Sequence, residues 1–394
     1  MNDRLSTSWG DYDLTRFPAD PRDQLRAWSA ADAYLLRHLA GEEGAPAVDL
    51  TGTVVVVGDR WGALTTALAG HEPVQITDSF LAREATLANL ARAGHTPDAA
   101  RLLTTRDAPP APGTGIDVLL IRVPKSLALL EDQLHRIAPA LRADTVVIGT
   151  GMVTEIHTST LELFERIVGP TKTSLARQKA RLIFSTPDLA LAAGPSPWPR
   201  TYMLPADSGA GAGLTVVNHA GIFCAEKLDI GTRFFLKHLP RARAGAHVVD
   251  LGCGNGVLGT AAFVADPDAT VTFIDESFQA VASAEATFRA NAAEGATAEF
   301  LAGDALAAVP PGTVDLVLNN PPFHSHQATT GATAWRMFSG ARAALRPGGE
   351  LWVVGNRHLG YHLKLRKLFG NARVMASDPK FVVLRAVKGE RDGR

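Results

Sequence analysis

The fold is decided by one stretch of the sequence, Val248-Val249-Asp250-Leu251-Gly252-Cys253-Gly254-Asn255-Gly256. The apolar residues at its start predict a buried strand, the glycines predict a tight turn, and a helix is expected from Val257. Strand, glycine turn and helix in this order are typical of an open α/β sheet, whose ligands bind at the carboxyl ends of the strands.

The same arrangement occurs a second time, earlier in the chain. Residues 54–64 parallel residues 248–258, residues 74–80 parallel 271–278, and residues 117–125 stand where the later half has 315–323. These segments keep their order and nearly their spacing. We therefore predict two homologous α/β domains, a first at residues 1–186 and a second at 215–394, joined by a Pro- and Gly-rich connector at 187–214. A lead-in helix is expected within residues 20–39.

Composition places the chain among ordinary globular proteins, with 394 residues, 46% of them hydrophobic and 20% charged. No apolar run of transmembrane length and no signal peptide is recognisable, so a cytoplasmic location is expected. Cys224 and Cys253 are the only cysteines, which predicts neither a disulfide framework nor a metal site. The net charge of −1 means that nucleic-acid binding would need local basic clusters.

The glycine turn alone leaves the cofactor open. Gly254, Gly256 and Gly259 also satisfy the dinucleotide fingerprint, so a nicotinamide-dependent oxidoreductase remains an alternative. Asp250 argues against it, because a carboxylate at the strand end repels phosphate and suits a cationic ligand. S-adenosylmethionine carries a sulfonium and an ammonium group and no phosphate.

Two further carboxylates follow successive predicted strands. Asp275 is placed to accept hydrogen bonds from ribose hydroxyls, and Asp304 from the adenine amine. Each aspartate by itself has an alternative explanation as a loop cap or a solvated charge. The set of three, at successive strand ends, predicts an S-adenosylmethionine site.

The loop Leu318-Asn319-Asn320-Pro321-Pro322-Phe323-His324 follows another apolar run and suggests the reaction. Its consecutive prolines give a stiff loop. The side chain of Asn320 and a proline carbonyl can hold the N–H groups of a planar amine or amide, and Phe323 can stack on its ring. The pattern is typical of methyltransferases that act on such nitrogens.

The first copy has lost these residues. Val56 stands in the place of Asp250, Arg60 in that of Gly254, and Arg122 and Val123 in those of Asn320 and Pro321, although Asp78 and Asp107 remain in the places of Asp275 and Asp304. We expect a degenerate, inactive first domain.

Over residues 20–388 the chain resembles the bacterial ribosomal RNA guanine-N2 methyltransferases, in which a degenerate copy precedes an active one. The matching stretches are residues 218–223, 228–235 and 320–324, and residues 356–362, 367–371 and 380–384 indicate the large-subunit branch. The resemblance implies two tandem Rossmann-like class I methyltransferase domains, each with a mostly parallel seven-stranded sheet and an antiparallel last strand.

The resemblance also implies a reaction and its residues. A methyl group would pass from S-adenosylmethionine to the exocyclic N2 of a guanine in 23S RNA. Asn320 and the Pro321–Pro322 loop would hold the amine, and Phe323 would stack on the base. Asp229 and Asn320 would also join the cofactor residues. His324 can contact RNA or simply cap the loop, and we assign it no role as a base.

Basic residues at comparable places in both copies are candidates for RNA contact, with a solvated helix face as the alternative explanation. They are Arg122, Lys125, Arg177, Lys179 and Arg181 in the first domain, and His324, Arg357, Lys364, Arg366 and Lys367 in the second. The degenerate copy would then be an RNA-docking platform.

Other functions remain open. They are guanine-N2 methylation of 16S RNA, N-methylation of adenine N6 or of a protein glutamine, and a non-catalytic RNA-binding assembly factor. No metal is expected, and the sequence does not define an oligomeric state.

Overall fold

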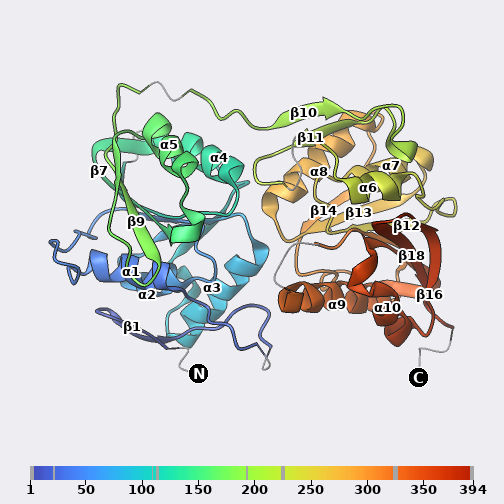
Figure 1. The fold of residues 1–394 in the computed structure, drawn as a ribbon, viewed down its shortest axis with the longest axis horizontal. Coiled ribbons are helices and arrows are strands. Elements are labelled where there is room, and N and C mark those ends of the chain that lie inside the picture. The colour runs from blue at the N-terminus through green and yellow to red at the C-terminus, as the bar shows by residue number, and fades with distance from the viewer. Residues whose placement is uncertain are drawn as a thin grey trace. The chain divides into compact units, whose positions relative to one another are not determined.

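The computed structural model describes residues 4–20, 23–108, 110–111, 115–191, 194–222, 227–322 and 327–390. The chain forms two compact units, Met1–Trp198 and Pro199–Arg394. Each is an α/β unit built on its own sheet (Figure 1).

The helices and strands of the first unit, in chain order over its described residues, are β1 (Arg4–Thr7), β2 (Gly10–Asp13), α1 (Ala30–Leu39), β3 (Val54–Val57), α2 (Ala63–Ala67), β4 (Val74–Thr77), α3 (Phe80–Arg92), β5 (Arg101–Thr104), β6 (Ile116–Arg122), α4 (Leu127–Ile137), β7 (Leu141–Met152), α5 (Thr158–Ile167), β8 (Thr171–Thr173) and β9 (Ala180–Ser185). Short 3₁₀ helices lie between several of them, including η4 (Val153–Glu155) after β7.

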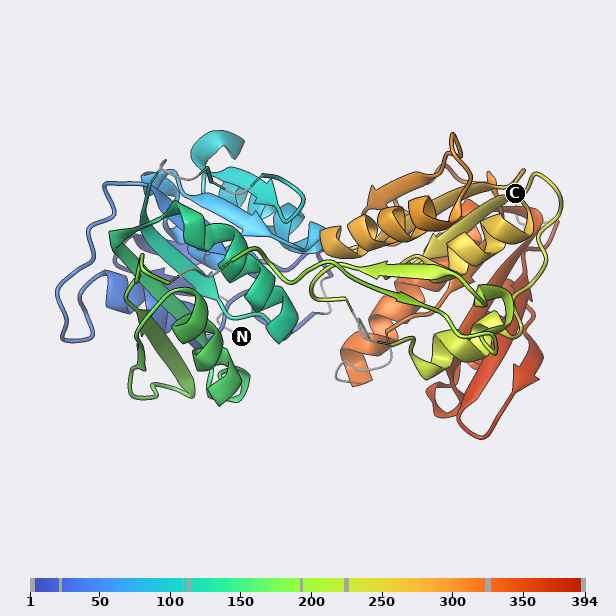
Figure 2. The same ribbon diagram turned by 90° about the horizontal axis from the view of Figure 1, so that it is seen from above.

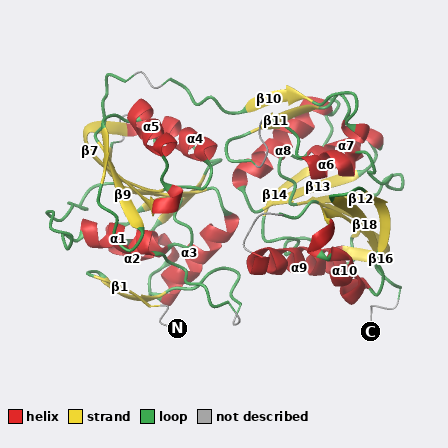
Figure 3. Cartoon of the chain, in the orientation of Figure 1, coloured by secondary structure: helices red, strands yellow, loops and turns green. Residues whose placement is uncertain are grey.

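The second unit repeats this sequence of elements (Figure 3). Over its described residues they are β10 (Arg200–Met203), β11 (Thr215–Asn218), α6 (Ile230–Leu236), β12 (His247–Leu251), α7 (Val257–Ala265), β13 (Thr270–Asp275), α8 (Phe278–Asn291), β14 (Glu299–Ala302), β15 (Val314–Asn319), α9 (Gln327–Ala344), β16 (Leu345–Asn356), η6 (Arg357–Leu359), α10 (Tyr361–Phe369), β17 (Arg373–Ser377) and β18 (Phe381–Val387).

Among the described residues each unit has one seven-stranded sheet, in the orders β5-β4-β3-β6-β7-β9-β8 and β14-β13-β12-β15-β16-β18-β17. The first five strands of each order are parallel. The last strand in sequence, β9 or β18, is antiparallel to both of its neighbours. The predicted fold class is confirmed. The strand order reverses between β3 and β6 and between β12 and β15, where α/β proteins bind ligands.

Helices cover both faces of each sheet (Figure 1 and Figure 2). In β12, Val248 packs with the residues of α6, α7 and α8, whereas its neighbour Val249 packs with those of α9 and α10. All four valines of β3 are buried, as expected for a parallel strand covered on both sides. Equivalent serines, Ser79 and Ser277, cap α3 and α8 through their side chains.

Two predicted boundaries need correction. The predicted connector at 187–214 contains β10, which pairs antiparallel with β11 and belongs to the second unit, so its second half is not a linker. The predicted lead-in helix begins only at Ala30, because Ser29 and Asp32 form a capping box there. Among the described residues no helix has the length and apolarity needed to span a membrane.

Candidate active site

The glycine turn between β12 and α7 is held against the next strand. The backbone N–H groups of Gly252 and Cys253 both donate to the carbonyl of Ile274 in β13, at 2.7 and 3.0 Å. Gly252, Gly254 and Gly256 all have positive φ angles, of 69°, 54° and 72°. Only glycine adopts this conformation without strain, which explains the three glycines.

The surroundings of these glycines differ. A Cβ at Gly256 would lie 2.6 Å from the Cα of Ala284 in α8, so this glycine allows close packing of the helix. A Cβ at Gly254 would meet no atom within 4 Å. Open space beside a glycine turn at the switch point of the sheet is room for a ligand.

Asp250 is the buried acid of this edge. Its Oδ2 accepts from the backbone N–H of Gly259 at 2.8 Å, whereas its buried Oδ1 has no hydrogen-bond partner among the described residues. Burial raises the pKa of Asp250 to about 8; the bond from Gly259 lowers it, and the charge of Asp275 raises it. A cation placed here would restore the charged form, because opposite charges lower an acid's pKa.

The remaining predicted cofactor residues lie on neighbouring elements. Asp275, at the end of β13, accepts from the N–H groups of Gly254 and Ser277 at 3.0 Å each, and burial raises its pKa. Asp304 follows β14 and forms an ion pair with Arg336 at 3.4 Å. Asp229 caps the N-terminus of α6.

Asn320 stands directly after β15, next to the glycine turn in the sheet. Its Nδ2 donates to Oγ1 of Thr232 in α6 at 2.8 Å. Its Oδ1 is buried and has no hydrogen-bond partner among the described residues. The preceding Asn319 donates to the carbonyl of Leu251 at 2.7 Å and so ties the two strand ends together. The site thus offers an acceptor without a partner among the described residues, beside the glycine turn.

The rest of the predicted loop is seen only in part. Pro321 is buried and Pro322 is exposed. Phe323 and His324 lie outside the described residues, so their predicted contacts with the base and with RNA stay predictions.

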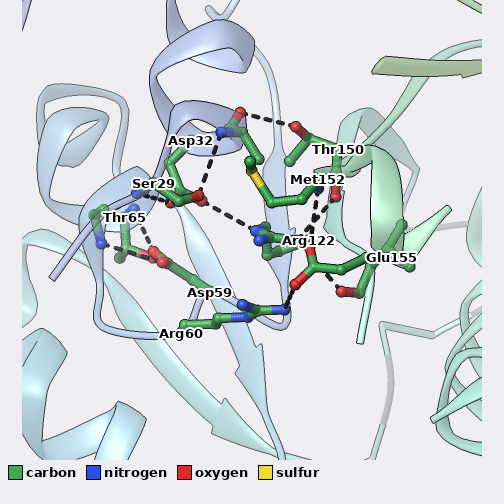
Figure 4. A network of polar contacts seen from close by, with 12 residues as sticks. Ser29, Asp32, Asp59, Arg60, Thr65, Arg122, Thr150, Met152 and Glu155 are labelled. Carbon is green, nitrogen blue, oxygen red and sulfur yellow. Dashed lines mark hydrogen bonds and ion pairs between the residues drawn. The ribbon is translucent and has the colours of Figure 1, made fainter. Parts of the chain in front are cut away.

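The corresponding edge of the first unit is filled by its own side chains (Figure 4). Strand register places Arg122 where the second unit has Asn320, since Ile121 pairs with Val57 as Asn319 pairs with Leu251. The side chain of Arg122 is fully buried, 3.3 Å from Asp32 and 2.9 Å from Glu155. The prediction that Arg122 contacts RNA is therefore wrong, because no part of its side chain reaches the surface.

Glu155 connects this network to the former glycine turn. Arg60, in the place of Gly254, pairs with Glu155 at 2.7 Å, and the backbone N–H of Met152 donates to the same carboxylate. Burial by itself would raise the pKa of Glu155, but the charge of Arg122, the bond from Met152 and the charge of Arg60 lower it to about 2. The carboxylate is therefore charged at neutral pH and fixed by cations of its own chain.

The other RNA candidates of the first unit lie near the carboxyl edge of its sheet. Lys125 and Lys179 are exposed. Arg177 is exposed as well and pairs with Glu43 at 3.1 Å, whereas Arg181 is half-buried in β9. The backbone carbonyl of Lys179 accepts from Val153, directly after β7.

In the second unit the candidates divide between the two edges. Arg357 follows β16 directly and Lys364 lies in the first half of α10. Arg366 and Lys367 are in the last turn of α10. Asn371, just beyond, bonds to Val387, which pairs with Glu350 in the first half of β16. Arg357 and Lys364 are thus closer to the candidate active site than Arg366 and Lys367.

Sequence reasoning missed three residues here. Thr232 bonds to Asn320 across 88 positions, which no local pattern announces. Asn356, at the end of β16, has a buried Oδ1 without a partner among the described residues. Lys380 is exposed, and its backbone carbonyl accepts from the N–H of Arg357. Lys179 has the equivalent bond in the first unit, where its carbonyl accepts from the N–H of Val153. An alignment of the two copies could have shown that the two lysines correspond.

Together these features fit S-adenosylmethionine. The unpartnered oxygen of Asp250 and the space beside Gly254 suit a cationic ligand, and Asp275 is a further acceptor at the same edge. Among the described residues no group of His, Cys, Asp and Glu side chains has the arrangement of a metal site.

Comparisons with known proteins identify the class of each unit. Residues 213–385 match the family model described as Methyltransferase small domain, so the second unit is a methyltransferase domain. Residues 2–189 match the model described as RLMG N-terminal domain. The chain belongs to the ribosomal RNA large subunit methyltransferase G family.

Two relatives that carry the name Ribosomal RNA large subunit methyltransferase G illustrate the range of sequence identity to this chain. The Streptomyces avermitilis protein is 70% identical over 388 residues, which cover 98% of this chain and 100% of that protein. The Stutzerimonas stutzeri protein is 47% identical over 385 residues, covering 98% and 99%. A T. thermophilus 16S rRNA N2 methyltransferase, solved with AdoMet and guanosine, superposes with a TM-score of 0.73 at 23% identity, covering 98% of this chain and 97% of that one. This last likeness shows the fold.

Proposed function

We propose that this protein transfers a methyl group from S-adenosylmethionine to the exocyclic N2 of a guanine in the 23S RNA of the large ribosomal subunit. The unused acceptor Oδ1 of Asn320, beside the cofactor turn, is the observation that carries the proposal. The name shared by relatives up to 70% identical supports the large-subunit substrate.

The chemistry needs positioning more than proton removal. The lone pair of the guanine amine is delocalised into the ring, so the amine is a weak nucleophile. Oδ1 of Asn320 and the carbonyl of Pro321 would each accept one N–H and turn the lone pair toward the methyl donor. Phe323 would stack on the base. After transfer the nitrogen is cationic and acidic enough to lose a proton to water, so no general base is assigned.

S-adenosylmethionine supplies the electrophilic methyl group when it is bound. Asp250 would stabilise its positive charge, Asp275 would accept from the ribose hydroxyls and Asp304 from the adenine amine. The turn of Gly252, Gly254 and Gly256 supports this assignment through the open space beside Gly254. Asp229 caps α6 and would act on the cofactor only through that helix.

RNA must be held while the base is extruded into the site, at a cost of a few kcal/mol. We propose that basic residues of both units contact the RNA backbone: Lys125, Arg177, Lys179 and Arg181 in the first unit, and His324, Arg357, Lys364, Arg366 and Lys367 in the second. Lys125 and Lys179 are the residues best suited to test RNA binding, because both are exposed. Lys125→Glu with Lys179→Glu should weaken RNA binding at least tenfold, an order of magnitude for two lost phosphate contacts, and leave cofactor affinity unchanged.

A matched control for this test is Arg101→Glu, which reverses an exposed charge at the amino-terminal edge of the same sheet. Equal losses of RNA affinity at both edges would show a general charge effect and remove the docking assignment. The proposal places the protein in the cytoplasm, with the ribosomal RNA.

The reaction itself is tested in cells. Ribosomal RNA from cells lacking the protein should lack one N2-methylguanosine of 23S RNA, detected by mass spectrometry of nuclease fragments. The modification should return with the wild-type protein and not with Asn320→Ala. Loss of a 16S modification, or no loss at all, would contradict the proposed substrate.

A further inference from the structure

Thr232 is the residue that holds the proposed catalytic amide. It is buried in the first turn of α6, where its backbone N–H donates to the capping Asp229 at 3.0 Å. Its Oγ1 accepts from Nδ2 of Asn320 at 2.8 Å, while Oδ1 of the same amide has no partner among the described residues. The hydroxyl thus occupies the donor end of the amide and leaves the acceptor end for a ligand.

The first unit has a link between the same two elements. There α1 takes the place of α6, because each helix precedes the sheet of its unit in the chain. Helix α1 contacts β7 and β9, and α6 contacts the equivalent strands β16 and β18. Asp32 is the third residue of α1 after its cap Ser29, as Thr232 is the third of α6 after Asp229. Asp32 pairs with Arg122 at the position of Asn320.

The two units join helix and strand by different interactions. In the first unit an ion pair joins helix and strand, and the guanidinium of Arg122, which has no acceptor atom, stands where the second unit has an amide. In the second unit a neutral hydrogen bond joins them, and one amide oxygen stays available.

We propose that Thr232 is a positioning residue of the methyltransferase, whose hydroxyl fixes the side-chain amide of Asn320 so that Oδ1 accepts from the amine of the target base. This inference rests on the proposed function. Without the hydroxyl, Nδ2 of Asn320 loses this partner, and the amide can turn its N–H groups toward the amine. Donor then faces donor, and the base is held poorly.

The test compares Thr232→Val, which keeps the shape of the side chain and removes the hydroxyl, with Thr232→Ser, which retains it. Thr232→Val should lower kcat by on the order of 10- to 100-fold, the effect of misplacing a reacting group, with the Kd for S-adenosylmethionine unchanged. Thr232→Ser should recover most of this loss. Equal kcat values for Thr232→Val and the wild type would overturn the proposal.

Thr287→Val is the matched control. Thr287 is also buried, and its hydroxyl bonds to the backbone of Val217, which links α8 to β11 away from Asn320. This variant should lower the Tm and leave kcat unchanged. A kcat loss in Thr287→Val equal to that in Thr232→Val would make the effect a general consequence of disturbed packing and overturn the proposal.

Coupling to Asn320 gives a second readout. In an Asn320→Ala background, Thr232→Val should have no further effect on kcat, because the group it positions is gone. The same fold-loss in both backgrounds would mean that Thr232 acts by another route. A wild-type protein that does not methylate guanine N2 at all would instead refute the proposed function.

Discussion

Nε of Arg122 lies 3.3 Å from Oδ1 of Asp32 and so joins the end of β6 to the first turn of α1. The equivalent link in the second unit is the hydrogen bond between Asn320 and Thr232. The two copies therefore share a helix-to-strand connection, with a buried ion pair in one and an amide in the other. This difference explains why one edge is closed by its own charges and the other is open to a ligand.

The network around Arg122 should stabilise the first unit. Arg122→Met removes a buried cation and leaves Asp32 and Glu155 without it, so the free energy of unfolding should fall by about 3–5 kcal/mol. Denaturant unfolding measures this. Arg166→Ala, which breaks an ion pair whose arginine is 62% exposed, should cost about 1 kcal/mol or less. Similar losses for the two variants would contradict a structural role for the network.

The pH dependence of this loss has a defined sign. Because the pKa of Glu155 is lowered to about 2 in the folded protein, its contribution to stability is present above the unfolded value of 4.5 and is lost as the pH falls toward 2. The difference between wild type and Arg122→Met should therefore shrink between these pH values.

One cofactor should bind per chain. Arg60 and Glu155 fill the edge of the first unit, whereas the second has open space beside Gly254. Isothermal titration with S-adenosylmethionine should give a stoichiometry of one. Asp275→Ala should abolish binding, and Asp78→Ala, at the equivalent position of the first unit, should leave it unchanged. Two sites, or equal effects of the two variants, would show that the first unit binds the cofactor.

Asp250 should make cofactor binding depend on pH. Its pKa of about 8 means that the cofactor-free protein holds it protonated at neutral pH. A cationic ligand favours the carboxylate, so the affinity should rise with pH up to about 8, by at most about tenfold per pH unit. Asp250→Asn should remove this component and bind more weakly. An unchanged pH profile in Asp250→Asn would exclude the charge interaction.

Asp250 should also make the stability of the cofactor-free protein depend on pH, and here a rise in pH should be unfavourable. With its folded pKa raised, the contribution of Asp250 is fully present below the unfolded value of 3.8 and is lost as the pH rises through about 8. In the cofactor-free protein Asp250→Asn should therefore gain stability relative to the wild type at pH 9, on the order of 5 kcal/mol at most.

Substitution of Gly256 should mainly lower protein stability, whereas substitution of Gly254 should mainly weaken cofactor binding. Gly256→Ala places a Cβ 2.6 Å from the backbone of α8 and should cost about 3 kcal/mol of stability. Gly254→Ala meets no atom within 4 Å, so it should cost only about 1 kcal/mol from its positive φ and should raise the cofactor Kd instead. Equal effects on stability and on Kd would contradict the assignment of the open space to the ligand.

The sequence predicts most of the fold because it carries the fold twice. Two strand-turn-helix units with matching glycines predict the two α/β domains, and the family resemblance adds the order of parallel and antiparallel strands. The cofactor edge that the aspartates indicate stays a prediction. The start of α1 was missed, since the apolar spacing before Ala30 continues past the true boundary and only the Ser29–Asp32 capping box marks it.

Side-chain environments were harder to predict. An arginine at a strand end, three residues before a lysine, suggests an RNA contact. Nothing near Arg122 in the sequence shows that Asp32 and Glu155 surround it. Thr232 is invisible for the same reason, because its role depends on Asn320 far along the chain. Tertiary contacts between distant segments decide whether a charged or polar residue is buried, paired or free.

The central claim is that Asn320 of the second unit holds a guanine amine for methylation. The most direct test is transfer of labelled methyl groups from S-adenosylmethionine to large-subunit ribosomal RNA, followed by nucleoside analysis of the product. Wild-type protein should produce N2-methylguanosine, and Asn320→Ala should lower kcat, measured at saturating S-adenosylmethionine, by about 100-fold or more. Undiminished transfer by Asn320→Ala, or a different methylated nucleoside, would contradict the account.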